Sequence, residues 1–299
     1  MADDLTDGSS LSRVRSSLLS WYAKDHRHFP WRGTTDPYAV LVSEVMLQQT
    51  QASRVVERFR TFMSRFPTAA ALRAASEAEV LAAWSGLGYN RRALALRRTA
   101  AAVAAHGWPD GVPAMERLPG IGPYTSRAIA SLAFGEPVGV VDTNVRRWLV
   151  RRFGLSPDAR PRELQALADA LAAAGHAADA AAWTHATMEF GAAICTPRTP
   201  RCDACPISTG CPSRGMAAAV PVPRQATFAG SDRAIRGALL RALAASRGHV
   251  MSVRAGHRMA PGPAFERVIV GLERDGLLHR SGGMLRLGGR PEAAATIGS

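Results

Sequence analysis

The fold of this chain is decided by a stretch that reads Leu118-Pro119-Gly120-Ile121-Gly122-Pro123-Tyr124-Thr125, followed further along by Val141-Asp142-Thr143-Asn144-Val145. Two glycines flank one apolar residue, so the backbone can turn tightly and point its N–H groups outward just before a helix expected from Thr125. A helix start of this kind suits a phosphate group. A Pro-Gly-x-Gly segment is also common as a plain turn.

Two carboxylates stand in apolar surroundings. Asp142 follows an apolar run at an expected helix start, so it is either an N-cap or a reacting group. Glu44 lies in a helix that Asp36-Pro37 opens and that we expect to reach about Thr50. Most of that helix is apolar, although Glu44 could also occupy a polar edge beside Ser43.

The four cysteines, Cys195, Cys202, Cys205 and Cys211, fall within seventeen residues with the spacing C-x6-C-x2-C-x5-C. Clustered thiols in a chain without a signal peptide favour metal over disulfides. The wide gaps let the loop surround something larger than one ion, which favours a 4Fe-4S cluster. Zinc and two disulfides are the alternatives.

The composition indicates a soluble protein with a polyanionic partner. The formal net charge is +13, and the pI is about 11.0, which favours nucleic acid. Lys24 is the sole lysine, so the excess of arginine could also reflect a GC-rich coding sequence. No run of eighteen apolar residues lacks a charge, and the first twenty residues contain no apolar signal region. We therefore expect a cytoplasmic, nucleoid-associated protein without a membrane span.

Helical periodicity dominates the chain, and almost nothing before residue 215 reads as a strand. We expect an all-α core with helices at 10–24, 37–50, 51–66, 76–86, 91–106, 125–134, 143–153, 161–174 and 178–194. A loop over 86–92 presents Leu87 and Tyr89 beside Arg91 and Arg92. Such residues can enter a base stack while arginines hold phosphates, although a loop tyrosine more commonly packs on its own domain.

A linker is predicted near 215–230, where Pro221 and Pro223 stand. The expected domains are a core over 1–224 and a small basic module over 225–299. Two helices at 231–246 and 264–275, followed by a hairpin about Gly282-Gly283, suggest a winged-helix-like module.

Taken together, the cysteine spacing, the Leu118–Gly122 hairpin and the Val141–Val145 segment resemble the helix-hairpin-helix DNA glycosylases of the endonuclease III superfamily. Within it, four segments look like the MutY-type adenine glycosylases, which remove adenine mispaired with 8-oxoguanine or guanine: Trp31-Arg32, Ser43–Gln51, Gly86–Tyr89 and Met188–Gly191. The resemblance implies a two-lobed helical fold, with a six-helix barrel and an iron-sulfur lobe. It also implies a monomer that binds duplex DNA.

The resemblance also assigns roles that agree with the residue chemistry. A carboxyl in an apolar helix can stay protonated and act as a general acid, which suits Glu44. A carboxylate beside the sugar can stabilise the oxocarbenium ion that the departing base leaves, which suits Asp142. Tyr124 and Asn144 would support this pair. Tyr124 stands where bifunctional relatives carry a lysine, and the chain has only Lys24, so we predict a monofunctional enzyme.

Further positions follow from the same matching. Trp31 belongs to a matching segment, and Arg32, Leu47 and Glu189 match positions that line the adenine pocket. Residues around the estranged 8-oxoguanine would be Gln49, Thr50, Leu87 and Tyr89. The backbone at Gly120 and Gly122 would hold a phosphate, and the four cysteines would bind the cluster.

The chain departs from the family pattern in two places. Thr143 stands where glycine is usual. The last 74 residues, 226–299, are too short and too helical for the Nudix-like domain that helps the family recognise 8-oxoguanine. Two other functions compete with adenine release. One is a thymine glycosylase for T opposite G, against which Glu44 weighs, and the other is an iron-sulfur DNA-binding redox sensor without catalysis.

Overall fold

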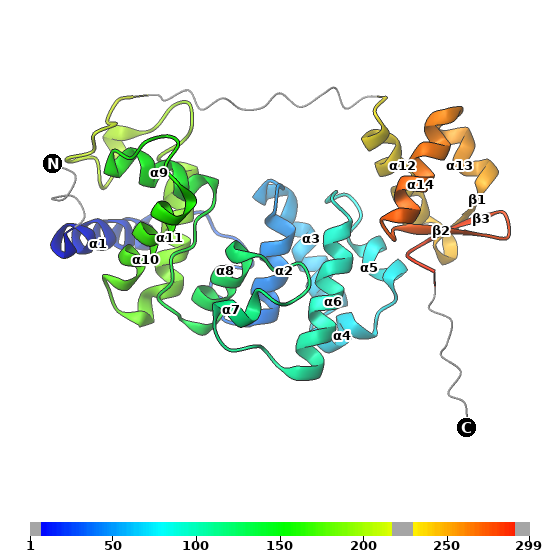
Figure 1. Ribbon diagram of the computed structural model, residues 1–299, viewed down its shortest axis with the longest axis horizontal. Helices are drawn as coiled ribbons and strands as arrows, with labels where there is room; N and C mark the ends of the chain where they lie inside the picture. The colour runs from blue at the N-terminus through cyan, green and yellow to red at the C-terminus, as the bar shows by residue number, and fades with distance from the viewer. Residues whose placement is uncertain (1–6, 217–229, 291–299) are drawn as a thin grey trace. The chain divides into compact units, whose positions relative to one another are not determined.

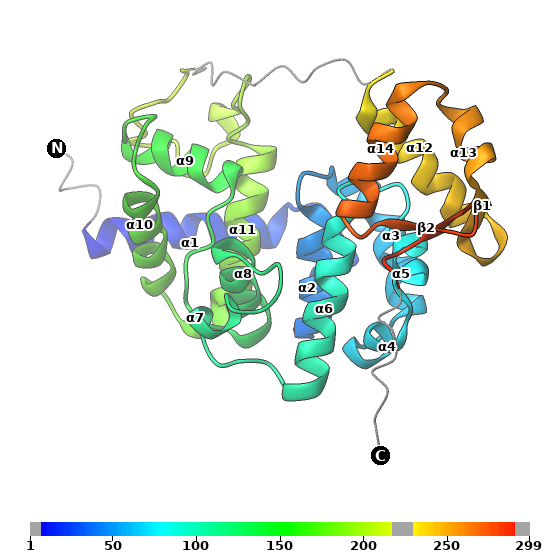
Figure 2. The same ribbon diagram turned by 45° about the vertical axis from the view of Figure 1, so that its right-hand side comes forward.

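The computed structural model describes residues 7–216 and 230–290, which are mostly helical (Figure 1; Figure 2). These residues form two compact units. The first unit comprises residues 7–44, 110–117 and 121–216, and the second comprises 45–109, 118–120 and 230–290. Each unit therefore combines segments that are far apart in the sequence.

The first unit packs its helices around one apolar core. Helix α1 (Gly8–Lys24) begins after Asp7, whose carboxylate accepts a hydrogen bond from the Ser10 N–H at 2.7 Å. It buries Leu11, Val14 and Leu18 on one face, which is the spacing of an amphipathic helix. The other helices of this unit are the first part of α2 (Pro37–Leu47), α7 (Val112–Met115), α8 (Pro123–Phe134), α9 (Thr143–Phe153), α10 (Pro161–Ala173) and α11 (Ala180–Ala193).

The second unit holds the end of α2 and the helices α3 (Ala52–Arg65), α4 (Ala69–Ala74), α5 (Glu77–Ala83) and α6 (Arg91–His106). Helix α5 begins with a capping box, because Ser76 and Glu79 hydrogen-bond each other's backbone N–H groups. The unit also contains helices α12 (Asp232–Ala245), α13 (Val253–Met259) and α14 (Pro263–Arg274), and strands β1 (Val250–Ser252), β2 (Leu278–Ser281) and β3 (Met284–Leu287).

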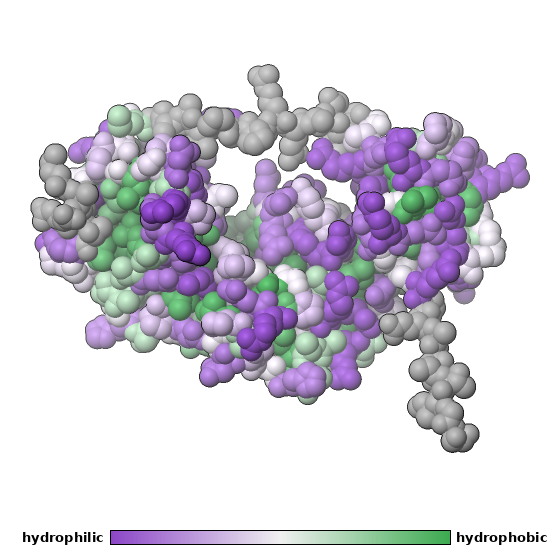
Figure 3. Space-filling model, in the orientation of Figure 1, coloured by the Kyte–Doolittle hydropathy of each residue, from purple (hydrophilic) through white to green (hydrophobic). Residues whose placement is uncertain are grey.

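The segment 230–290 has the element order of a winged helix: helix, strand, helix, helix, strand, strand. Its antiparallel sheet has the order β1-β3-β2, in which Arg280 pairs with Leu285. Phe265, Leu272 and Leu285 are fully buried. Hydrophilic side chains cover most of this segment on the face drawn in Figure 3, with a small apolar patch among them.

The predicted fold class is confirmed, with differences in detail. Helix α8 begins at Pro123 rather than Thr125 because proline is favoured in the first helical turn. Helix α2 ends at Leu47 rather than near Thr50, and Gln49 then takes a left-handed φ of 54°. Helices α4, α7 and α13 and strand β1 were not predicted. The predicted domain boundary at 224/225 and most of the predicted linker lie outside the described residues. No helix of residues 7–216 or 230–290 is long and apolar enough to span a membrane.

Candidate active site and metal centre

Glu44 is a buried carboxyl on α2, with only 5% of its surface exposed. Burial disfavours the ionised form and raises the pKa of Glu44 to about 7. A hydrogen bond from Tyr124 opposes this rise, and the charge of Asp142 adds to it. Glu44 is therefore a carboxyl that can hold its proton near neutral pH.

Tyr124 lies in the first turn of α8, directly after the glycine hairpin. Burial and the nearby charges of Glu44 and Asp142 raise the pKa of Tyr124 well above its ordinary value. The phenol therefore stays protonated and can donate to Glu44. Its oxygen also lies 4.0 Å from Sδ of Met188 on α11.

Asp142 is the N-cap of α9, which is one of the two roles that the sequence suggested for it. Its Oδ1 accepts the Val145 N–H at 2.6 Å, and its Oδ2 accepts Nδ2 of Asn144 at 2.8 Å. Both carboxylate oxygens are thereby fixed in direction. The charge of Asp142 nevertheless acts on Glu44 and Tyr124, so the cap and a chemical role are compatible.

Arg147 connects this region to the cysteine loop, a link that the sequence did not suggest. Its guanidinium donates to Oδ1 of Asn144 at 3.0 Å, to the Gly191 carbonyl at 2.6 Å and to the Cys195 carbonyl at 2.8 Å. Gly191 allows α11 to approach α9, because a Cβ there would lie 2.7 Å from the Asn144 carbonyl oxygen. A chain of hydrogen bonds thus runs from Asp142 through Asn144 and Arg147 to the backbone of Cys195.

Glu189 on α11 is buried, with 1% exposed, and is held by two arginines. Arg27 Nε and Arg32 Nη2 each lie 2.6 Å from a Glu189 carboxylate oxygen. Burial opposes ionisation, but the hydrogen bonds from Arg27 and Arg32 outweigh it and lower the pKa of Glu189. Trp31 lies in the core and stacks on Phe29 at 4.9 Å between ring centroids. Arg27 was not singled out from the sequence.

His185 is a second residue near this site that no sequence motif marks. It lies one helical turn before Glu189, and therefore on the same face of α11. Burial and the charges of Arg32 and His26 lower the pKa of His185 to about 4. The imidazole is accordingly neutral at pH 7. The four-residue spacing from Glu189 was the available signal.

The second unit holds the residues matched to the estranged base. Tyr89 is exposed and has a left-handed φ of 46°, whereas Leu87 is buried with 7% exposed. Arg92, which the sequence suggested as a phosphate ligand, forms hydrogen bonds to the end of α2 and the turn after it. Its Nη1 donates to the Val45 carbonyl at 2.7 Å, and its Nη2 lies 3.4 Å from Oγ1 of Thr50. Arg92 therefore fixes the turn that carries Gln49.

The hairpin has the geometry that its glycines predict. Gly120 has a φ of 78°, and a Cβ there would lie 2.7 Å from Cβ of Ala95. Gly122 is the N-cap of α8 and offers no side chain to its N–H groups. The start of α8 is thus a helix N-terminus of the kind that accepts an anion.

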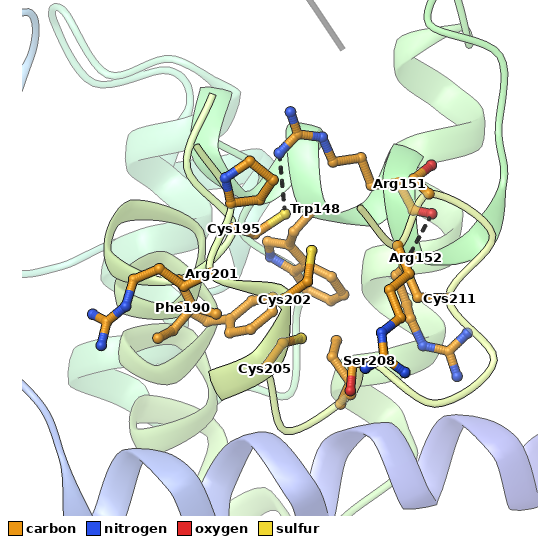
Figure 4. Close-up of a pocket in the computed structure, with 15 residues that line it drawn as sticks. Trp148, Arg151, Arg152, Phe190, Cys195, Arg201, Cys202, Cys205, Ser208 and Cys211 are labelled. Carbon is orange, nitrogen blue, oxygen red and sulfur yellow. Dashed lines mark hydrogen bonds between the residues drawn. The ribbon is translucent and has the colours of Figure 1, made fainter. Parts of the chain in front are cut away.

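The four cysteines line one pocket of the first unit, together with Trp148 and four arginines (Figure 4). Arg151 Nη1 lies 3.5 Å from Sγ of Cys195, and the Gly215 N–H points to Sγ of Cys202 at 3.5 Å. Burial raises the pKa of the Cys205 thiol to about 11. The fold therefore brings the four predicted ligands together in the segment that follows α11.

Two buried N–H donors of residues that line this pocket lack an acceptor in the part of the chain that the structure describes. Nε1 of Trp148 and Nε of Arg152 have no hydrogen-bond partner among residues 7–216 and 230–290. Over the same residues, no three His, Cys, Asp or Glu side chains are placed to hold a single metal ion. The donor set, four thiols with N–H groups around them, fits an iron-sulfur cluster.

Comparison with known proteins places this arrangement in a superfamily. The model of the HhH-GPD superfamily of base excision DNA repair proteins matches residues 42–173. The solved structure of a thermostable thymine-DNA glycosylase is similar with a TM-score of 0.62 and 30% identity, over 69% of this chain and 98% of that one. A trapped endonuclease III–DNA intermediate has a TM-score of 0.56 and 22% identity, over 66% of this chain and 92% of that one, which shows a shared fold.

Curated relatives identify the family within this superfamily. The adenine DNA glycosylase of Mycobacterium tuberculosis H37Rv is 42% identical over 77% of this chain and 78% of its own length. That of Mycolicibacterium smegmatis is 43% identical over 75% and 78%, and the human one is 39% identical over 70% and 40%. The chain belongs to the adenine DNA glycosylase family of the HhH-GPD superfamily.

Proposed function

We propose that this protein hydrolyses the bond between adenine and deoxyribose in duplex DNA, where adenine is mispaired with 8-oxoguanine or guanine. Membership of the adenine DNA glycosylase family supports the reaction class. The observation that carries the proposal is the contrast between Glu44, a buried carboxyl whose pKa is about 7, and Asp142, whose oxygens accept two hydrogen bonds. One carboxyl can keep its proton while the other serves as an anion.

The first chemical step is protonation of the base. An enzyme that acts on a paired base extrudes it from the stack, because the glycosidic bond is otherwise inaccessible. Glu44 then donates its proton to the adenine ring, which turns a poor leaving group into a neutral one. Tyr124 holds the Glu44 carboxyl by its hydrogen bond.

Bond cleavage leaves positive charge on the sugar. The Asp142 carboxylate stabilises this oxocarbenium ion by its charge or by a transient bond, as in retaining glycosidases. A water molecule then adds to the sugar carbon and gives its proton to the Glu44 carboxylate. This step restores the acid and leaves an abasic site. Asn144 keeps Asp142 in place during the step.

Binding of the two bases is assigned to separate sets of residues. Arg32, Leu47 and Glu189 would line the adenine pocket, and Arg27 would help Arg32 to fix the Glu189 carboxylate. Around the estranged base we place Gln49, Thr50, Leu87 and Tyr89. The backbone at Gly120 and Gly122 would bind a phosphate.

Hydrolysis without strand cleavage is expected from the distribution of lysine. Lys24, the sole lysine, is exposed at the end of α1, and Tyr124 follows the hairpin. No lysine side chain from the hairpin can therefore form a Schiff base with the sugar. We infer a monofunctional enzyme that acts as a monomer in the nucleoid.

We assign a 4Fe-4S cluster to Cys195, Cys202, Cys205 and Cys211, with Trp148 and Arg152 as N–H donors beside it. The cluster would cross-link the loop that follows α11, and the hydrolysis needs no electron from it. After anaerobic purification we expect about four irons per chain. An iron-free protein that contains zinc would contradict the assignment.

The decisive assay is single-turnover base release from duplexes with A opposite 8-oxoguanine, A opposite G, and T opposite G, each with and without alkali. We expect adenine release, with strand breaks only after alkali. Thymine release would instead favour the function of the similar thymine-DNA glycosylase structure. Absence of release from every duplex would favour a DNA-binding redox sensor.

A further inference from the structure

A groove of about 1040 Å³ lies within the second unit, and the proposed function assigns a role only to residues on its core side. One group of lining residues comes from the core segments 48–54 and 85–92, which include Gln49 and Tyr89. The other group comes from the C-terminal segment and is carried mainly by α12. Leu81, Leu240, Leu277 and Leu287 add apolar surface to the lining.

Specific contacts hold the C-terminal segment beside the core segments. The Gly289 N–H donates to Oε2 of Glu77 at 2.8 Å, and a Cβ at Gly288 would lie 3.2 Å from Cβ of Glu77. Asp275 lies 2.5 Å from Nη2 of Arg236 on α12 and 3.9 Å from Nη1 of Arg91 on α6. The groove is therefore built by the fold of this unit.

The lining of the groove is strongly basic. It contains one acidic residue, Asp275, and six arginines, which gives a net formal charge of +5. The six are Arg54, Arg91, Arg92, Arg233, Arg236 and Arg241. Such a concentration of positive charge attracts a polyanion. The core side of the groove already carries residues matched to DNA contacts, so a nucleic acid is the occupant that fits.

Helix α12 presents a regular basic face to the groove. Arg233, Gly237 and Arg241 are spaced by four residues and lie along one side of the helix. Both arginines are exposed. A Cβ at Gly237 would lie 3.2 Å from Nη1 of Arg241, so the glycine leaves room for that guanidinium on the basic face.

Helix α14 differs, although it holds the position of the recognition helix in a winged helix. One of its two arginines, Arg267, pairs with Asp232 at 2.7 Å. Its acidic residues Glu266 and Glu273 each pair with Arg280 at 2.9 Å. The two glutamates of this helix balance its two arginines, so the helix carries no net formal charge that would attract a phosphate backbone. The basic face of α12 is the better nucleic-acid surface.

We propose that Arg233 and Arg241 of α12 bind phosphates of the duplex, so that the C-terminal module contacts DNA through α12 rather than through α14. The proposal rests on the proposed function, because it takes the same duplex as ligand. Eight helical residues span about 12 Å, and one strand carries a phosphate every 3.4 Å or so of duplex axis. The two guanidiniums therefore contact different phosphates.

The test uses the full-length protein with Arg233→Gln and Arg241→Gln combined. The matched control combines Arg254→Gln and Arg258→Gln on α13, which remove the same charge at the same spacing from exposed positions outside the groove lining. A Lys substitution at both 233 and 241 restores the charge. Helix content and melting temperature of all three variants are compared with wild type.

Binding is measured by fluorescence anisotropy on a duplex whose adenosine carries a 2′-fluorine, which blocks cleavage by destabilising the oxocarbenium ion. The titrations run from about 50 to 300 mM sodium chloride, with G or 8-oxoguanine opposite. Loss of two phosphate contacts should lower the slope of log K against log salt by about 2. We expect affinity to fall about tenfold for both duplexes at the lower salt concentrations, with recovery in the Lys variant and little change in the control.

Three results would overturn the inference. One is a groove variant that binds like the control at every salt concentration. Another is a loss confined to the 8-oxoguanine duplex, which would indicate base recognition rather than phosphate contact. A third is a stronger dependence on these arginines for duplex RNA of the same sequence than for DNA.

Single-turnover release at saturating enzyme separates this inference from the proposed function. The groove variant should release adenine at the wild-type rate once it is saturated, because neither arginine contacts the reacting atoms. If wild type releases no adenine, the proposed function fails, while the salt slopes still decide whether α12 binds the duplex.

Discussion

The carboxyl cluster of the first unit and the arginine groove of the second unit use charge in opposite ways. Glu44 is buried, and the surroundings of its carboxyl determine its protonation. Arg233 and Arg241 are exposed to water. Burial makes a charge sensitive to its neighbours, whereas water screens the interactions of an exposed charge.

This difference teaches which substitutions affect chemistry and which affect binding. A change at Glu44, Tyr124 or Asp142 should alter rates and pH profiles and leave affinity for DNA close to normal. A change at the exposed arginines should alter affinity and its dependence on salt and leave the saturated rate unchanged. Substitutions in the carboxyl cluster test the first half of this comparison.

The largest effect is expected for Asp142→Asn. The neutral amide cannot stabilise the oxocarbenium ion, so the single-turnover rate of adenine release should fall about 1,000-fold or more. Asparagine caps a helix as well as aspartate does, so α9 should keep its start. Rapid-quench assays measure the rate, and anisotropy on the uncleavable duplex checks binding. A rate near that of wild type would exclude Asp142 from the reaction.

Glu44→Gln should remove the general acid and lower the rate at pH 7 by about 100-fold or more. In wild type the acid must be protonated, and the pKa of Glu44 is about 7. The wild-type rate should therefore fall about tenfold per pH unit above pH 7. The variant should lack this descending limb, whereas the groove variant of α12 should retain it. A wild-type profile that is flat from pH 6 to 9 would contradict the assignment.

The burial of Glu44 should also make the free energy of unfolding depend on pH. Well below its ordinary pKa of 4.5, Glu44 is protonated in both folded and unfolded chains. As the pH rises towards 7, the unfolded chain ionises while the folded one does not, so stability declines and then levels off above the folded pKa of about 7. The decline is on the order of 3 kcal/mol and should be absent in Glu44→Gln.

Urea titrations of the intact wild type and Glu44→Gln at several values of pH from 4 to 9 would measure this difference. Relative to wild type, the variant should gain stability as the pH rises. Parallel curves for the two proteins would show that Glu44 ionises as freely in the folded chain as in the unfolded one.

The smallest effect is expected for Tyr124→Phe. The lost hydrogen bond favours the ionised form of Glu44, so its removal should raise the pKa of that carboxyl further. The descending limb of the pH profile should move to higher pH, and the rate at pH 7 should change by less than about tenfold. A limb displaced to lower pH would mean that the phenol does not donate to Glu44.

Much of the architecture could be predicted from local patterns. The Asp36-Pro37 start, the glycine hairpin and the 3.6-residue periodicity of α1 each depend on neighbours within a few residues. Strand β1 and helix α13 could not be found in this way. The strand has three residues and is defined by its pairing with β3, which lies more than thirty residues later.

The candidate site was also only partly accessible from the sequence. Motif resemblance pointed to Glu44, Asp142 and the cysteines, and these assignments stay predictions until the assays are done. Arg147 and Arg27 were missed because their partners, Cys195 and Glu189, lie far along the chain. The contact between Arg92 and the Val45 carbonyl was missed for the same reason, since it spans a long sequence separation.

The sequence by itself determined the helical class of this protein, its hairpin, and the spacing of its four cysteines, because caps, turns and periodicity are local properties. Only the tertiary structure decided that Glu44 keeps its proton near pH 7 and that α12 shares a groove with Tyr89. Desolvation and Coulomb interactions depend on distances in space, and those distances are set when segments far apart in the chain pack together.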